Sequence, residues 1–241
     1  ITVHIGANFK KVKDLKTPLT SLIEKIDGKL TIDHLPSTFD YSLMSQDGYI
    51  EKGFTGAIVG VGCVESGFLF HTAPGIESFM DPDLAVLLLY LQYLSQLEGP
   101  MWKKIRKNSY GYNIMPRPNE GQTVFSLYRA TNIYEAYKDA KTIVETQVAE
   151  GSEFDLTLLE SAKSSLIFEI IEREKTVGDL VSQAMLNSFK GVPKDYNKLL
   201  VDRISTISVE DLRRVGSKYL AAMFKPSTCK VTIVCHPEKV E

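Results

Sequence analysis

The stretch DPDLAVLLLYLQYL, residues 81–94, decides the fold class because it indicates a buried helix. Pro82 suits the first helical position, where its missing N–H is no loss. Leucines then recur at helical spacing: Leu84, Leu87, Leu88, Leu91 and Leu94. The apolar run stops well short of the roughly 18 residues that a membrane helix needs. We therefore predict a helix in the core of a globular domain and no membrane partner.

Segments rich in β-forming residues lie on both sides of this helix. Two such runs precede it, at 57–64 and 67–73. Two more follow it, YGYNIMPRP at 110–118 and TVFSLYRAT at 123–131. The turn signal PNEG, residues 118–121, separates these last two. We therefore predict that they form a β-hairpin.

The second half of the chain is dominated by helical patterns. We predict helices at about 132–150, 154–174, 176–190 and 194–206. A further helix begins at Ser208, because the residues from Ser208 to Asp211 are close to a capping box, with Asp where Glu or Gln is usual. Its predicted apolar stripe is Val209, Leu212, Val215, Tyr219 and Met223.

The order of the predicted elements indicates the architecture. CKVTIVCHP, residues 229–237, ends the pattern as a strand. Strands, a helix, a hairpin, several helices and a last strand are typical of an α+β domain with an antiparallel or mixed sheet covered by helices. Strict βαβ alternation is absent, so we do not expect a doubly wound sheet.

Composition limits the partners of the protein. The chain has 241 residues, 44% of them hydrophobic, which suffices for a proper core. Its formal net charge of -2 gives no global field that would gather nucleic acid or anionic lipid. Three cysteines form no CxxC pair, and their odd number argues against a disulfide framework. We expect a reducing compartment and no nucleic-acid partner.

Motifs for several kinds of chemistry are absent. The sequence has no P-loop, no GxGxxG, no GxSxG elbow, and no HExxH or HxxEH. The histidines are scattered singly: His4, His34, His71 and His236. Cys63 and His71 form only a same-face strand pair, where we do not expect a thiol nucleophile. We therefore expect this chain, purified alone, to hold no stoichiometric zinc.

The first part of the chain has a different character. ITVHIGANF, residues 1–9, alternates like a half-buried strand, residues 17–26 indicate a short helix, and residues 33–54 show no sustained period. The chain also begins with Ile1 and shows no signal-peptide pattern. We interpret residues 1–54 as the end of a preceding domain plus a linker, and 55–241 as a separate domain.

The passage GPMWKKIRKNSYGYNIMPRP, residues 99–118, holds the only tryptophan and a basic cluster. Together with the helix before it, this passage resembles the C-terminal half of the pitrilysin/insulinase (inverzincin) family of zinc metallopeptidases, and most closely its presequence-protease-like branch. The residues that carry the resemblance are Leu97, Gly99, Pro100, Met101, Trp102, Ile105, Arg106, Tyr110 and Gly111. ESGFLFHTAPGI, residues 65–76, is similar to the family's strand before that helix.

The resemblance implies a role within a larger protein. Members of the family have four homologous α+β domains in two halves that close around a chamber. The first domain carries an HxxEH zinc site, and the fourth supplies an arginine and a tyrosine. Residues 55–241 resemble the fourth domain, with 1–54 as the end of the third plus a linker. The implied partners are a peptide substrate and an N-terminal half that holds the zinc.

Arg106 and Tyr110 correspond to the family's arginine and tyrosine. A guanidinium and a phenol aimed at a scissile carbonyl can stabilise the developing oxyanion. The family usually has about five residues between the two positions, whereas only residues 107–109 intervene here. Either the loop is two residues short, or residues are missing between Arg106 and Tyr110, or Tyr112 takes the role as the alternative to Tyr110. A structural role also stays open, with Arg106 ending a helix against its dipole and Tyr110 packing in a strand.

The resemblance thus implies the C-terminal, non-zinc-binding domain of an intracellular zinc metallo-oligopeptidase, cytoplasmic or mitochondrial. It would contribute substrate binding and oxyanion stabilisation to peptide hydrolysis and would be inactive alone. The main alternative is a non-catalytic scaffold, because the family also includes inactive halves and core subunits of a respiratory complex. A free-standing interaction module would be favoured if residues 1–241 were the whole natural chain.

Overall fold

The computed structural model of the chain describes residues 6, 10, 11, 14, 17, 20 and 56–240. The strand predicted over 1–9 and the helix predicted over 17–26 therefore lie almost wholly outside the described residues. The linker predicted over 33–54 lies entirely outside them. The boundary that we placed at residue 54 stays a prediction.

A five-stranded mixed sheet forms one layer of the domain, in the order β1-β5-β2-β4-β3. The strands are β1 Gly56–Gly60, β2 Gly67–Pro74, β3 Ser109–Arg117, β4 Gln122–Ala130 and β5 Lys230–Cys235. The pairing of β1 with β5 is parallel, and the other neighbouring strands are antiparallel. The α+β class with a mixed sheet is confirmed. The first strand ends at Gly60, earlier than the predicted 57–64 run.

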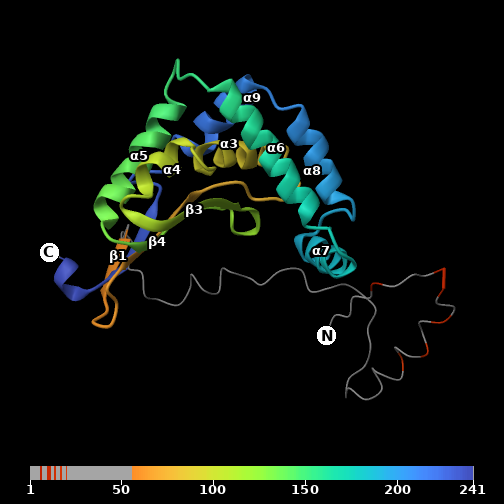
Figure 1. Cartoon of the computed structure of the whole chain (residues 1–241), viewed down its shortest axis with the longest axis horizontal. Helices are drawn as coiled ribbons and strands as arrows, with labels where there is room; N and C mark the ends of the chain where they lie inside the picture. Colours follow the sequence, from red (N-terminus) through yellow and green to blue (C-terminus); the bar gives the residue numbers. More distant parts are fainter. Residues whose placement is uncertain are drawn as a thin grey trace.

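Helices form the second layer, on one side of the sheet (Figure 1). They are α3 Asp83–Ser95, α4 Pro100–Ile105, α5 Ile133–Val148, α6 Leu156–Glu172, α7 Val177–Lys190, α8 Tyr196–Ser205 and α9 Val209–Val215. The described residues also form three short helical turns: the 3-10 turns η1 Pro118–Glu120 and η3 Pro237–Lys239, and the π-helical turn η2 Gly216–Leu220. Every helix predicted from periodicity in the second half of the chain is present.

Helix α3 is the centre of the core. It lies between the sheet and the other helices and contacts β3, α6, α8 and α9. Leu87, Leu89 and Leu94 have no exposed surface. Tyr90 and Tyr93 are buried as well, so the helix is apolar on nearly all sides, as expected for a helix covered on every face.

An ion cluster fixes the N-terminal end of α3 to the end of the helical layer. The Asp83 side chain is 7% exposed and accepts hydrogen bonds from Arg214 Nη1 at 2.7 Å and Lys218 Nζ at 2.9 Å. Burial acts to raise the pKa of Asp83, but the hydrogen bonds from Lys218 and Arg214 outweigh it and hold the pKa below its ordinary value. The cluster thus ties α3 to α9 and η2.

His71 on β2 is a core residue. It is fully buried, its Nε2–H donates to the Met223 carbonyl at 2.7 Å, and its Nδ1 accepts from the Tyr137 hydroxyl at 3.2 Å. Burial lowers the pKa of His71, and the hydrogen bond to Met223 only partly opposes this. Burial raises the pKa of Tyr137 to about 12, so its phenol stays a donor. The geometry holds the imidazole neutral.

We expect acid to destabilise the protein through His71. Its pKa is lower in the folded than in the unfolded chain, where it lies near 6.5, so the unfolded chain binds the proton first. The stabilisation is present above the unfolded value and is lost as the pH falls below it. Urea unfolding at about pH 7.5 and about pH 5.5 measures the effect. His71→Gln should respond less to pH, and an equal response in both proteins would contradict the assignment.

Candidate functional site

A tight turn aims helix α4 away from the end of α3. Glu98 has a positive φ of 63°, and Gly99 follows in extended conformation. A Cβ at Gly99 would lie 2.8–3.0 Å from backbone oxygens at the end of α3, so only glycine fits there. Pro100 then starts α4, and Met101 and Ile105 anchor it with no exposed surface. The Gly-Pro element of the motif therefore positions the basic residues that follow.

Arg106 and Tyr110 lie together at the junction of α4 and β3. Arg106 ends α4, and its Nη1 donates to the Tyr110 carbonyl oxygen at 2.8 Å. Its guanidinium carbon also lies 5.9 Å from the centre of the Tyr110 ring. Tyr110 is 66% exposed, and Arg106 is exposed as well. The short interval between them allows the contact, because β3 begins at Ser109 directly after the turn.

Tyr112 points to a different part of the molecule. Its hydroxyl donates to the Ser95 carbonyl at 2.9 Å, at the C-terminal end of α3. The side chain is half-buried, and burial raises its pKa to about 12. The structure therefore brings Arg106 and Tyr110 together and gives Tyr112 a hydrogen bond within the fold.

Arg129 is a residue of this site that the sequence reasoning missed. Its guanidinium carbon lies 5.6 Å from the centre of the Tyr110 ring. The hairpin pairs Ser109 with Ala130 and Gly111 with Tyr128, which places Arg129 opposite Tyr110. The turn at 118–121 was the available signal, since pairing the two strands outward from it would have brought positions 110 and 129 near each other.

The described residues do not fit a zinc site. No group of three or more His, Cys, Asp or Glu side chains that could hold a metal ion occurs among them. His71 is buried with both ring nitrogens engaged, and Cys63, Cys229 and Cys235 are free thiols. Within these same ranges, none of the helices has the length and apolar character needed to cross a bilayer.

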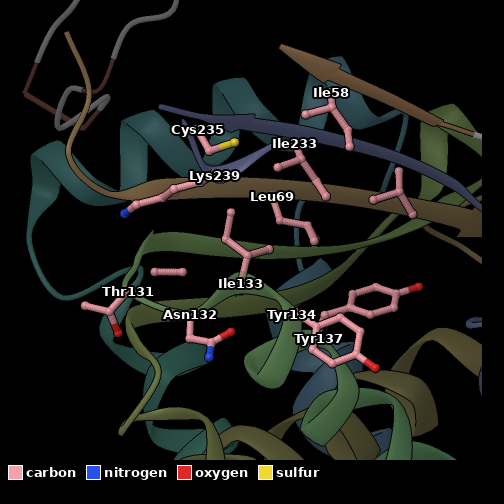
Figure 2. Close-up of a pocket in the computed structure, with 13 residues that line it drawn as sticks. Ile58, Leu69, Thr131, Asn132, Ile133, Tyr134, Tyr137, Ile233, Cys235 and Lys239 are labelled. Carbon is pink, nitrogen blue, oxygen red and sulfur yellow. The ribbon is translucent and has the colours of Figure 1, made fainter. Parts of the chain in front are cut away.

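A separate pocket lies between the sheet and the start of α5 (Figure 2). Its volume is about 520 Å³, and apolar side chains such as Ile58, Leu69, Ile133 and Ile233 line it. Lys239 at the pocket donates to the Glu65 carbonyl at 2.7 Å. Neither Arg106 nor the two candidate tyrosines belong to its lining.

Sequence comparison links the chain to longer proteins, while no family model matches it. It is 32% identical to an uncharacterized protein of Caenorhabditis elegans over 76% of this chain and 18% of that protein. It is 27% identical to an uncharacterized protein of Saccharomyces cerevisiae over 99% of this chain and 24% of that protein. The chain thus spans about a fifth of the length of these curated relatives.

Solved structures identify the fold. The peptidase M16 inactive domain from Pseudomonas fluorescens matches with a TM-score of 0.61 at 17% identity, over 76% of this chain and 43% of that chain. A protease from Helicobacter pylori gives 0.63 at 12% identity, over 92% and 52%. The periplasmic protease PqqL from Escherichia coli gives 0.58 at 11% identity, over 92% and 24%. The chain has the fold of an M16 (pitrilysin/insulinase) peptidase-like domain.

Proposed function

We propose that this chain is the C-terminal, non-zinc-binding domain of a zinc metallo-oligopeptidase of the presequence-protease-like branch. It contributes substrate binding and oxyanion stabilisation to the hydrolysis of peptides in a closed chamber. The M16 peptidase-like fold, the motif residues 97–111 and the much greater length of the sequence relatives support this proposal. Its partners are then a peptide substrate and the N-terminal half of the same protein.

The observation that carries the proposal is the contact between Arg106 and Tyr110. The hydrogen bond from Arg106 Nη1 to the Tyr110 carbonyl fixes the guanidinium beside the phenol and leaves its other N–H groups free to donate. Both side chains are exposed, so a peptide can reach them. Donors held in place before the reaction stabilise an oxyanion more than donors that must reorganise.

In this proposal the chain itself binds no zinc. The described residues offer no ligand set, so the metal of the full-length enzyme would be bound by its N-terminal half. The side chains of this chain act on the substrate carbonyl oxygen and need no metal for their own arrangement. This chain alone is therefore expected to be inactive.

A non-catalytic scaffold of the same fold is the second candidate. The solved domain from Pseudomonas fluorescens is described as an inactive domain, which favours this alternative. Arg106 and Tyr110 would then serve only to join α4 to β3. Kinetics on the full-length protein separate the two candidates.

Arg106→Lys is the experiment that tests the proposal. A single ammonium cannot hold the Tyr110 carbonyl and donate to an oxyanion with the geometry of the planar fork. We expect kcat for peptide hydrolysis to fall at least about tenfold, since a hydrogen bond to a charged group contributes about 1.5–3 kcal/mol. Arg117→Lys, at the end of β3, is the matched control and should keep wild-type kinetics. Wild-type turnover in Arg106→Lys and Arg106→Ala would favour the scaffold.

We further propose an intracellular location, cytoplasmic or mitochondrial. Cys63, Cys229 and Cys235 are all free, as expected in a reducing compartment. Imaging of the tagged full-length protein tests the location, and a secreted product would contradict it.

A further inference from the structure

We infer that Arg106, Tyr110 and Arg129 form a cationic clamp that binds a carboxylate of an acidic peptide. The binding of an acidic peptide does not depend on the proposed function. Only the view that this peptide is a substrate rests on it. It assigns a role in specificity to Arg129, which lies outside the motif that pointed to Arg106 and Tyr110.

Two guanidinium groups share one aromatic ring in the clamp. The Arg106 and Arg129 guanidinium carbons lie 5.9 Å and 5.6 Å from the centre of the Tyr110 ring. The ring attracts each cation, but the two cations repel each other. An anion bound at this ring would offset that repulsion by pairing with the guanidinium groups. A carboxylate suits this geometry because guanidinium groups bind it in a bidentate manner.

The backbone of β4 holds Arg129 in this place. Arg129 has a φ of 53°, in the left-handed region that residues other than glycine rarely adopt. The register on both sides of it, Ser109 with Ala130 and Gly111 with Tyr128, keeps it opposite Tyr110. The hairpin itself therefore sets the position of Arg129, which is what a preformed binding group requires.

The clamp lies within a local excess of positive charge. The exposed cations around it are Lys103, Lys104, Arg106, Lys107 and Arg129. Within the part of the chain that the structure describes, none of these five forms an ion pair, whereas Arg117 on the same hairpin pairs with Glu120 at 3.4 Å. Since the whole chain carries a net charge of -2, this excess is local and would attract an acidic segment to this one surface.

The position of β3 favours a peptide as the partner. Among the described strands, β3 lies at one edge of the sheet, so one row of its backbone groups faces away from β4. The Tyr110 carbonyl, near the start of β3, accepts its hydrogen bond from the Arg106 side chain. An extended peptide can pair with such an edge and place acidic side chains at the clamp. A nucleic acid would need a longer track of cations along its phosphates.

Fluorescence anisotropy on the full-length protein tests the inference. The probes are a labelled extended peptide with Glu and Asp residues, the same peptide with Gln and Asn in their place, and a single-stranded oligonucleotide of equal charge. We expect the acidic peptide to bind about tenfold more tightly than the neutral one, and salt to weaken this preference. Arg129→Gln should remove most of the preference.

Two control variants make the outcome specific. Arg117→Gln removes an arginine from the same hairpin and should preserve the preference for the acidic peptide. Arg129→Lys keeps the positive charge and should retain part of the preference for the acidic peptide. The side chain of Arg129 is exposed, so these changes should leave the unfolding midpoint near that of the wild type, which thermal unfolding checks.

Equal binding of the two peptides, or an unchanged preference in Arg129→Gln, would overturn the inference. Tighter binding of the oligonucleotide through Arg129 would overturn it in favour of a nucleic-acid surface. The result also separates the inference from the proposed function. An acidic preference that depends on Arg129, together with normal turnover in Tyr110→Phe, Tyr112→Phe and Arg106→Ala, would support the clamp and reject oxyanion stabilisation.

Discussion

We expect Tyr110→Phe to lower kcat of the full-length protein about a hundredfold, or about 3 kcal/mol, while changing KM much less. The reason is that a phenol O–H that donates to the substrate oxygen only as negative charge develops stabilises the transition state and not the bound substrate. Phe keeps the ring that lies near Arg106 and Arg129, so the change removes the hydroxyl alone. Steady-state kinetics on a peptide substrate measure the effect.

Tyr112→Phe is the internal control for this result. It removes the hydrogen bond to the Ser95 carbonyl, so we expect a loss of about 1 kcal/mol of stability and an unchanged kcat. The opposite pattern, in which Tyr112→Phe has a strongly reduced kcat and Tyr110→Phe has a normal kcat, would assign the role to Tyr112. Wild-type kinetics in both variants and in Arg106→Ala would show that this passage is structural.

The largest effect on stability is expected for Phe125→Ala, at about 4 kcal/mol. Phe125 has no exposed surface and lies on β4 between His71 of β2 and Ile114 of β3. Its ring centre lies 5.9 Å from that of Phe224. Truncation would leave a cavity between the sheet and the helical layer, and the paired strands cannot collapse to fill it.

Phe70→Ala provides the matched comparison on the other face of the sheet. Phe70 is adjacent to His71 on β2, but its side chain is 52% exposed. The same chemical change there should cost less than about 1 kcal/mol. Urea unfolding of the two variants measures the difference. Similar losses for both would mean that the face of the sheet that carries Phe70 contributes as much to stability as the core.

Local patterns were sufficient for most of the elements. The leucines of residues 84–94 indicated a buried helix, because helical spacing and apolar character are both properties of the sequence itself. The β3–β4 hairpin was predicted from PNEG, where Gly121 adopts the positive φ of 61° that the turn needs. The capping box at Ser208 is present, with Asp211 bonding back to the Ser208 backbone N–H.

Contacts between distant segments decided the rest. The stripe from Val209 to Met223 predicted one continuous helix, but α9 ends at Val215 and a π-helical turn follows. A Cβ at Gly216 would lie 2.4 Å from the ring of Tyr90, so the close approach of α3 shapes the chain there. The parallel pairing of β1 with β5 likewise joins the two ends of the described domain, which no local pattern encodes.

Local sequence likewise determined one part of the candidate site, and tertiary contacts determined the other. The sequence by itself determined the residue types at 106 and 110, their short interval, and the turn and strand that bring them together. Only the tertiary structure decided that Tyr112 turns its hydroxyl to Ser95 and that Arg129 lies over Tyr110. Spacing along the chain limits which neighbours a residue can reach. The direction of a side chain and its partner from another strand depend on how α3, β3 and β4 pack, and that is a property of the whole fold.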